Sequence, residues 1–206
     1  MVELSGVSFG YQSDKNVLDN LNLRMEEGRF YGLLGMNGSG KTTLLKLIAG
    51  KLFAHGGEIY VDGRNLRERD VETLQKVFML PADFIFPNMS LEQFLAIYSE
   101  FYPEFRKEVL NDCLVNFEIQ RDIKNLNQLS LGEKHKVAFS IALSLGTKIV
   151  LLDEAANGMD IPARKMFRKL LMKHVREDQI VVLSTHIVQD IENLLTDVIV
   201  LRKDAP

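Results

Sequence analysis

The stretch Gly35-Met36-Asn37-Gly38-Ser39-Gly40-Lys41-Thr42 decides the fold of this chain. It matches the pattern G-x-x-x-x-G-K-[ST] at every position. Glycines allow the backbone to curl so that successive N–H groups point inward at phosphate oxygens, and a helix starting at Lys41 adds the positive end of its dipole. The apolar run Phe30–Leu34 precedes the stretch and a helical pattern over Thr42–Ala49 follows it. This context favours a phosphate loop over a plain glycine-rich turn.

The loop predicts a role for each of its side chains. We expect Lys41 to reach the β- and γ-phosphates of a bound nucleotide and the hydroxyl of Thr42 to bind Mg²⁺. The rest of the loop and the next helical residue are expected to complete the nucleotide contacts. These residues are Asn37, Gly38, Ser39, Gly40 and Thr43.

Apolar runs that alternate with helical patterns indicate an α/β fold. Runs of four apolar residues suit central parallel strands buried on both faces, and they occur at Val77–Leu80, Ile149–Leu152, Ile180–Leu183 and Val198–Leu201. Alternating patterns at Val2–Phe9 and Leu18–Leu23 predict half-exposed strands, and a short strand is expected at Glu58–Val61. Later helices are expected at 91–101, 109–117, 132–145, 164–175 and 187–195.

The order of these elements predicts a single domain with an insertion. Mixed strands come first, strand–helix units follow, and a mainly helical block interrupts them before they resume. We therefore expect a P-loop NTPase core over residues 1–84 and 146–206, with a mixed or antiparallel β subdomain. The helical subdomain is expected over about residues 85–145.

The amino-acid composition of the chain helps to exclude several classes of protein function. The 206 residues include 25 Lys and Arg against 28 Asp and Glu, a net charge of −3, which does not indicate a direct nucleic-acid binder. The single cysteine, Cys113, cannot form an internal disulfide and points to a reducing compartment. No apolar run approaches the roughly 20 residues of a membrane span, and the N-terminus does not have the pattern of a secretory signal. We expect a cytoplasmic protein.

Two acids follow the apolar run Ile149–Leu152. In a phosphate-loop enzyme the first acid at such a strand end, Asp153, would hold Mg²⁺ together with Thr42, and Glu154 would polarise the attacking water. The alternative is a pair of solvated acids. The phosphate loop makes the metal-binding and catalytic interpretation the stronger one.

Three further features carry weight only in combination. Ser130 and Glu133 fit a capping box that opens a helix, and a helix N-terminus with a serine also suits a γ-phosphate. His186 follows the run Ile180–Leu183, and Tyr11 follows the first strand. Each alone is more typical of packing or local structure than of a site.

Together these residues resemble the nucleotide-binding subunit of ATP-binding cassette (ABC) transporters, in the family's order over nearly the whole chain. Gly35–Thr42 is similar to the Walker A motif, Ile149–Asp153 to Walker B, and Leu129–Glu133 to the family signature, usually Leu-Ser-Gly-Gly-Gln. Asn157–Asp160 is similar to the D-loop. His186 matches the switch histidine, and Tyr11 matches the aromatic residue that stacks on adenine.

The resemblance implies an ATPase whose catalytic residues are Glu154, His186 and Lys41. It implies a head-to-tail dimer, of this chain or with a second ABC subunit, that encloses two ATP molecules. Ser130 and Gly132 would then act in trans on the partner's γ-phosphate. It further implies that separate permease subunits hold the chain at the cytoplasmic face of a membrane.

The sequence departs from the family pattern in several places. The signature has Leu131 for glycine and Glu133 for glutamine, and Ala155-Ala156 replaces Pro-Thr after the catalytic acid. The largest departure is Ala82, where the family places the glutamine of the Q-loop. Alanine cannot ligate Mg²⁺ or contact the attacking water.

These observations leave three functional hypotheses. The first is a transporter subunit, whose permease would dock on apolar residues beside the Q-loop. These residues are Phe84, Ile85, Phe86, Met89 and Phe94. The alternative is that they only pack the helical subdomain. The second is a soluble ABC ATPase, although neither a coiled-coil insertion nor a second cassette is present in the sequence. The third is an ATP-binding regulator with weak hydrolysis, which Ala82 and Glu133 favour.

Overall fold

The computed structural model describes residues 1–12, 15–185 and 192–202, and contains two sheets. One sheet has five parallel strands in the order β6-β7-β8-β3-β9. Its strands are β3 (Arg29–Gly35), β6 (Val77–Leu80), β7 (Ile149–Asp153), β8 (Ile180–Ser184) and β9 (Asp197–Leu201). The other sheet is antiparallel in the order β2-β1-β4-β5. Its strands are β1 (Val2–Phe9), β2 (Leu18–Met25), β4 (Gly56–Val61) and β5 (Arg64–Asn65).

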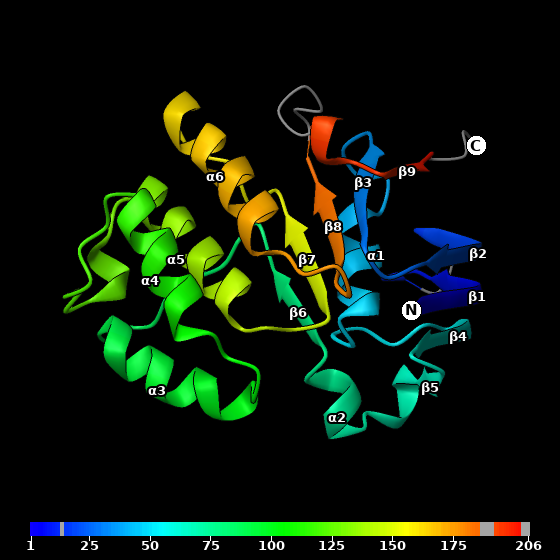
Figure 1. Ribbon diagram of the computed structural model, residues 1–206. Helices are drawn as coiled ribbons and strands as arrows, with labels where there is room; N and C mark the ends of the chain where they lie inside the picture. Colours follow the sequence, from blue (N-terminus) through cyan, green and yellow to red (C-terminus); the bar gives the residue numbers. More distant parts are fainter. Residues whose placement is uncertain (13–14, 186–191, 203–206) are drawn as a thin grey trace.

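Helices cover both faces of the parallel sheet. Helix α1 (Lys41–Ile48) lies between the two sheets, and α3 to α6 gather on the opposite side (Figure 1). The remaining α-helices are α2 (Val71–Leu74), α3 (Leu91–Phe101), α4 (Lys107–Asn116), α5 (Leu131–Ser144) and α6 (Ile161–His174). Short 3₁₀ turns occur at Leu66–Glu68, Leu126–Gln128 and Glu192–Leu194. The α/β class expected from the sequence is confirmed.

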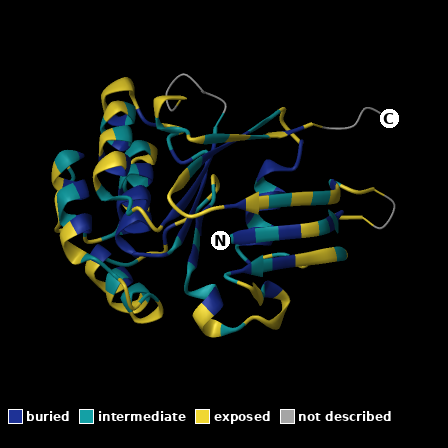
Figure 2. Ribbon diagram, turned by 45° about the vertical axis from the view of Figure 1, so that its right-hand side comes forward, coloured by how far each residue is buried: buried dark blue, intermediate teal, exposed yellow. Residues whose placement is uncertain are grey.

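Strand β7 shows why the central runs are entirely apolar. Its side chains alternate between two cores: Ile149 and Leu151 pack with α1 and the antiparallel sheet, while Val150 and Leu152 pack with the helices α3 to α6. All of its residues are buried, as Figure 2 shows for the middle of the sheet. Because both faces are covered, no position of the strand has to be polar.

The run Val198–Leu201 does not form the central strand that the sequence predicts. Strand β9 pairs only with β3 and forms an edge of the sheet. Val198 and Val200 are each more than half exposed, while Leu201 is buried. An apolar run predicts a strand covered on both faces, but no element of the described chain covers the outer face of Val198 and Val200.

Local signals explain where the helices begin and end. Ser90 with Gln93 and Ser130 with Glu133 form full capping boxes at the starts of α3 and α5, the second as the sequence predicts. Gly50, with φ +65°, lets the chain leave α1 in the left-handed conformation. Helix α6 begins at Ile161 rather than at the expected residue 164, because Asp160 caps it and Pro162 suits its first turn. Most of the helix expected at 187–195 lies outside the described residues.

An ionic cluster ties the two sheets together at the edge opposite the phosphate loop. The carboxylate of Asp62, in the β4–β5 turn, accepts from Lys76 at 3.0 Å, from Lys148 at 3.2 Å and from the amine of Met1 at 2.8 Å. Burial acts to raise the pKa of the Asp62 carboxyl, but these hydrogen bonds together bring that pKa well below its usual value. Asp62 is therefore a charged link between the two sheets.

We expect Asp62→Asn to lower the free energy of unfolding by about 2 kcal/mol at pH 7, because charge-assisted bonds are lost. Since the folded pKa is lowered, the contribution of Asp62 is present above the unfolded pKa of about 3.9 and declines as the pH falls below it. Urea denaturation between pH 7 and pH 2.5 measures the difference. Asp178→Asn, at an exposed pair with Arg176, is the control and should change little. Equal stability of Asp62→Asn and wild type at pH 7 would contradict the linking role.

Candidate functional site

The phosphate loop lies at the carboxyl edge of the parallel sheet, between β3 and α1. Gly38 and Gly40 have φ values of +77° and +97°, which a residue with a side chain rarely adopts. Gly35 is needed for a different reason. A Cβ there would lie 2.4 Å from the Ser39 Oγ and 2.6 Å from the carbonyl oxygen of Leu201. The loop therefore curls tightly against the end of β9.

Several donors of the loop are available to an anion. Gly40 is the N-cap of helix α1, and no side chain of the described residues caps the first turn of this helix. The Ser39 hydroxyl is buried and has no hydrogen-bond partner in the described part of the chain. The ammonium of Lys41 donates to the carbonyl oxygens of Gly35 at 2.7 Å and Met36 at 3.1 Å, and so lies across the loop. This set of free N–H groups, a hydroxyl and a cation suits a phosphate group.

Strand β7 brings a carboxylate to the loop. The Thr42 Oγ1 donates to the Asp153 Oδ2 at 2.7 Å, and the Ser184 hydroxyl donates to the Asp153 Oδ1. The Asp153 side chain is almost completely buried. No group of three or more His, Cys, Asp or Glu that could hold a metal occurs among the described residues. Mg²⁺ in a nucleotide site needs only one or two carboxylates besides phosphate and water oxygens, so the oxygens of Thr42 and Asp153 fit it.

Glu154 follows Asp153 in an uncommon conformation, with φ +50°. Its N–H donates to both the carbonyl oxygen and the Oγ of Ser184, each at 3.1 Å. The amide of Asn157 donates to the Glu154 Oε2 at 2.5 Å. Asn157, three residues further along the chain, thus holds the carboxylate of Glu154.

Tyr11 lies beside the first turn of α1. Its Oη is 3.2 Å from the Thr43 Oγ1, and its ring packs edge-on against Phe9 with centroids 5.1 Å apart. The side chain is 62% exposed, which leaves much of the ring open to a ligand. The structure thus brings Tyr11 and Thr43 together at the phosphate loop.

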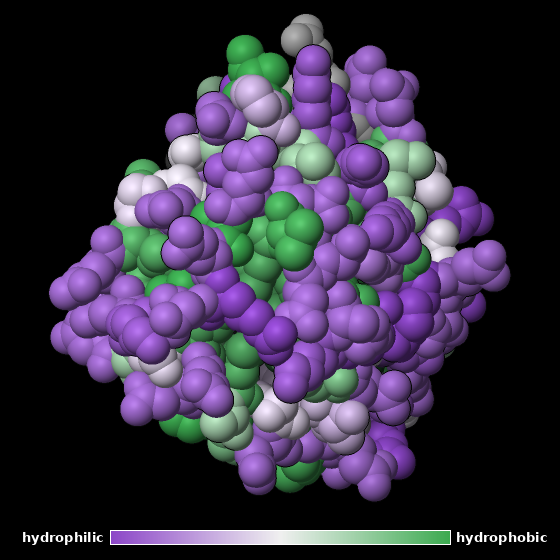
Figure 3. Space-filling view, turned by 60° about the vertical axis from the view of Figure 1, so that its left-hand side comes forward, coloured by the Kyte–Doolittle hydropathy of each residue, from purple (hydrophilic) through white to green (hydrophobic). Residues whose placement is uncertain are grey.

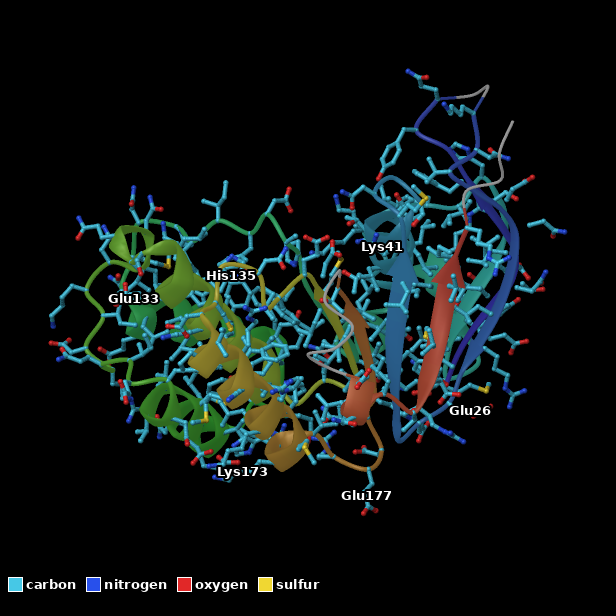
Figure 4. The ribbon with its side chains drawn as sticks, turned by 90° about the horizontal axis from the view of Figure 1, so that it is seen from above. Glu26, Lys41, Glu133, His135, Lys173 and Glu177 are labelled. Carbon is cyan, nitrogen blue, oxygen red and sulfur yellow. The ribbon has the colours of Figure 1, made fainter. Side chains whose placement is uncertain are left out.

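Ser130 and Gly132 are not part of this cluster. The Ser130 Oγ donates to the Glu133 Oε2 at 2.6 Å, and the Ser130 N–H donates to the same oxygen at 2.9 Å. These bonds from Ser130 lower the pKa of the Glu133 carboxyl. Figure 4 shows Glu133 in the helical part, well apart from Lys41. His186, the switch residue expected from the sequence, lies outside the described residues.

An apolar groove borders the segment between β6 and α3, where the sequence places the Q-loop. It encloses about 500 Å³, and its lining includes all five apolar residues singled out in the sequence. Phe86 and Phe94 are buried, whereas Ile85 is 85% exposed. The face of the molecule that carries the helices is otherwise largely polar, with apolar side chains gathered near its middle (Figure 3). Part of this set therefore packs against the helices, while Ile85 is exposed.

The sequence did not point to Ser184 or to the contact between Asn157 and Glu154. Ser184 reaches the site because β8 pairs with β7, so that Ser184 lies directly opposite Asp153. The sequence did carry one signal: Ser184 comes directly after the apolar run Ile180–Leu183, as Asp153 comes directly after Ile149–Leu152. The ends of parallel strands meet at one edge of a sheet, but the strand order is not visible in the sequence.

We expect Gly35→Ala to destabilise the chain more than Gly38→Ala. The added methyl at Gly35 meets a backbone oxygen that cannot rotate away, which should cost about 3 kcal/mol. A Cβ at Gly38 meets nothing within 4 Å, so only its positive φ matters, at about 1 kcal/mol. Urea denaturation of both variants checks the ranking, and equal stabilities would contradict the tight loop geometry.

Comparison with known proteins shows which family the chain belongs to. A family model described as ABC transporter matches residues 18–157. The ABC transporter ATP-binding protein NatA of Bacillus subtilis is 30% identical, over 98% of this chain and 86% of its own length. The ATP-binding protein YtrB of the same organism is 30% identical over 94% of this chain, which spans about two thirds (66%) of the length of YtrB.

A solved structure described as the ATP binding subunit of an ABC transporter superposes with a TM-score of 0.87, covering 100% of this chain and 88% of its own. At 24% identity that likeness concerns the fold alone. It confirms the fold expected from the motifs. By the family match and its relatives, the chain belongs to the ABC transporter family, among its ATP-binding subunits.

Proposed function

We propose that this chain binds and hydrolyses ATP, with Mg²⁺, to drive transport by separate membrane-spanning subunits. The observation that carries the proposal is the 2.7 Å bond between Thr42 and Asp153, which joins the phosphate loop to the acidic end of β7. Glu154 is the next residue, so the donors for phosphate, the oxygens for a metal and a second carboxylate are neighbours. The match to the ABC transporter family supports the same assignment.

In the proposed reaction the chain positions the reactants and supplies charge. The loop N–H groups, with Asn37, Gly38, Ser39, Gly40 and Thr43, hold the phosphates, and Lys41 leaves its carbonyl partners to reach the γ-phosphate. Glu154 orients and polarises the attacking water while Asn157 fixes its carboxylate. Mg²⁺, held by Thr42 and Asp153, would neutralise charge on the transferred group. From the sequence we assign His186 a further contact to the γ-phosphate, and Tyr11 a stacking contact to adenine.

The complete site requires two chains in this proposal. In the proposed division, residues 85–145 are a helical subdomain that carries the signature residues Ser130 and Gly132. Glu133, which shares a capping box with Ser130, lies well apart from Lys41 (Figure 4). A head-to-tail dimer, with a second copy or another ABC subunit, brings them to the partner's γ-phosphate. The exposed side chain of Leu131 would then face the other chain.

The permease partner would dock in the apolar groove beside Phe84 and Ile85. Among the residues that the structure describes, no helix is both long and apolar enough to cross a bilayer. The transport pathway would then belong to separate subunits, and the chain would sit at the cytoplasmic face through them. We propose that the chain does not contact nucleic acid directly.

One observation favours a second function, an ATP-binding regulator with weak hydrolysis. The segment after β6 carries Ala82 where the family has glutamine, and alanine has no group to contact the metal or water. Steady-state turnover of the purified chain separates this hypothesis from the first.

Glu154→Gln should reduce the rate of ATP hydrolysis by at least about 100-fold, because an amide cannot accept the proton of the attacking water. ATP binding should persist, and an ATP-locked dimer should accumulate. A coupled ATPase assay and size-exclusion chromatography with MgATP measure both effects. Glu177→Gln, far from the loop in Figure 4, is the matched control. Near-normal hydrolysis in Glu154→Gln would refute the role of Glu154.

Ile85→Glu should prevent capture of the permease, since a charge in the groove has to be desolvated on docking. The tagged chain is purified in detergent from its native cells, and co-purifying proteins are identified by mass spectrometry. Wild type and the control Val115→Glu, at an exposed position on α4, should both retain a polytopic membrane protein at near-equal stoichiometry. Recovery of soluble partners alone would instead support a soluble ABC ATPase.

A further inference from the structure

Ser184 ends β8 and is almost completely buried. Its Oγ makes contacts with two consecutive residues, Asp153 and Glu154. It donates to the carboxylate of Asp153, and it accepts from the N–H of Glu154 at 3.1 Å. Its carbonyl oxygen accepts from the same N–H, also at 3.1 Å. One serine thus contacts both acids of the site, and it does so from the neighbouring strand.

The conformation of Glu154 shows why such a contact matters. A glutamate with φ +50° is held in a sparsely populated region and persists only when its surroundings fix it. The two acceptors on Ser184 fix the Glu154 N–H, and the amide of Asn157 fixes its carboxylate. Without the Ser184 hydroxyl, the Glu154 N–H would lose one of the two acceptors on Ser184 and keep the carbonyl oxygen.

The Asp153 carboxylate is fixed from two sides. Thr42, on α1, donates to one oxygen, and Ser184, on β8, donates to the other. A carboxylate with both oxygens oriented in this way presents a defined lone pair to a metal or to a metal-bound water. The Ser184 contact also leaves Thr42 free to turn toward a ligand without releasing Asp153.

A buried serine does not need such a role, and Ser140 provides the comparison. Ser140 is equally buried on α5, but its Oγ donates to the carbonyl oxygen of Lys136 in its own helix. That bond satisfies the hydroxyl and touches no acid. The bonds of Ser184 differ because both go to the residues proposed for metal binding and catalysis.

We propose that Ser184 is a positioning residue. Its hydroxyl fixes the positions of the Asp153 carboxylate and the Glu154 peptide relative to the phosphate loop. The inference rests on the proposed function, since it assigns Ser184 a part in the same reaction. It predicts that the hydroxyl affects turnover and Mg²⁺ dependence but not the metal-free binding of ATP.

The test compares Ser184→Ala, Ser184→Thr and the control Ser140→Ala. In Ser184→Ala we expect kcat to fall about 10- to 100-fold and the Mg²⁺ concentration for half-maximal rate to rise about 10-fold. Losses of this size are typical when a residue that hydrogen-bonds to a metal ligand is removed. The dissociation constant for ATP in EDTA should stay within about twofold, because the loop donors remain. Ser184→Thr keeps the hydroxyl and should recover most of kcat. Ser140→Ala should keep wild-type kinetics even if its Tm falls.

A second readout does not depend on turnover. The rise in Tm on adding Mg²⁺ together with a non-hydrolysable ATP analogue should shrink in Ser184→Ala but not in Ser140→Ala. The proposal would be overturned if Ser184→Ala had the kcat and Mg²⁺ dependence of wild type, or if its rise in Tm equalled that of wild type. Absence of turnover in wild type would instead refute the proposed function, while the Tm comparison would still decide the role of Ser184.

Discussion

The bond between the Thr42 hydroxyl and the Asp153 carboxylate is the constraint on which the site depends. It joins residues 111 positions apart in the chain and fixes the phosphate loop against the end of β7. Strand β7 in turn is fixed by two cores, because its side chains alternate between α1 on one face and the helical side on the other. A phosphate loop alone could hold an anion. The sheet adds the Asp153 carboxylate, which accepts from Thr42 at 2.7 Å, and Glu154 is the next residue in the chain. This arrangement makes the loop a candidate for hydrolysis.

The same architecture places the residues proposed for the site in two parts of the molecule. The core carries the loop, the acids and Tyr11, whereas the helical part carries Ser130 and Gly132 at the start of α5. The bonds between Ser130 and Glu133 complete the start of α5 within one chain. Figure 4 shows Glu133, which bonds to Ser130, well apart from Lys41, and this separation is the physical reason for proposing that two chains complete each site.

The sequence predicted those features that depend on local pattern. The loop was visible because its glycines and lysine stand at fixed spacing, and the capping box at Ser130 because it spans four residues. Features that depend on neighbours in space were missed or wrong. Val198 and Val200 are apolar but lie on an edge strand, and Ser184 meets Asp153 only because β8 lies next to β7. The roles assigned to Glu154, Ser130 and Tyr11 remain predictions from the motifs, and His186 lies outside the described residues.

The central claim is that two chains together hydrolyse MgATP. The most direct measurement is the steady-state rate per chain at saturating MgATP, followed over a wide range of protein concentration and repeated in EDTA. We expect a Mg²⁺-dependent rate per chain that rises with protein concentration and levels off as the dimer forms. A rate per chain that stays constant while the protein remains a monomer, or ATP binding without any turnover, would contradict it.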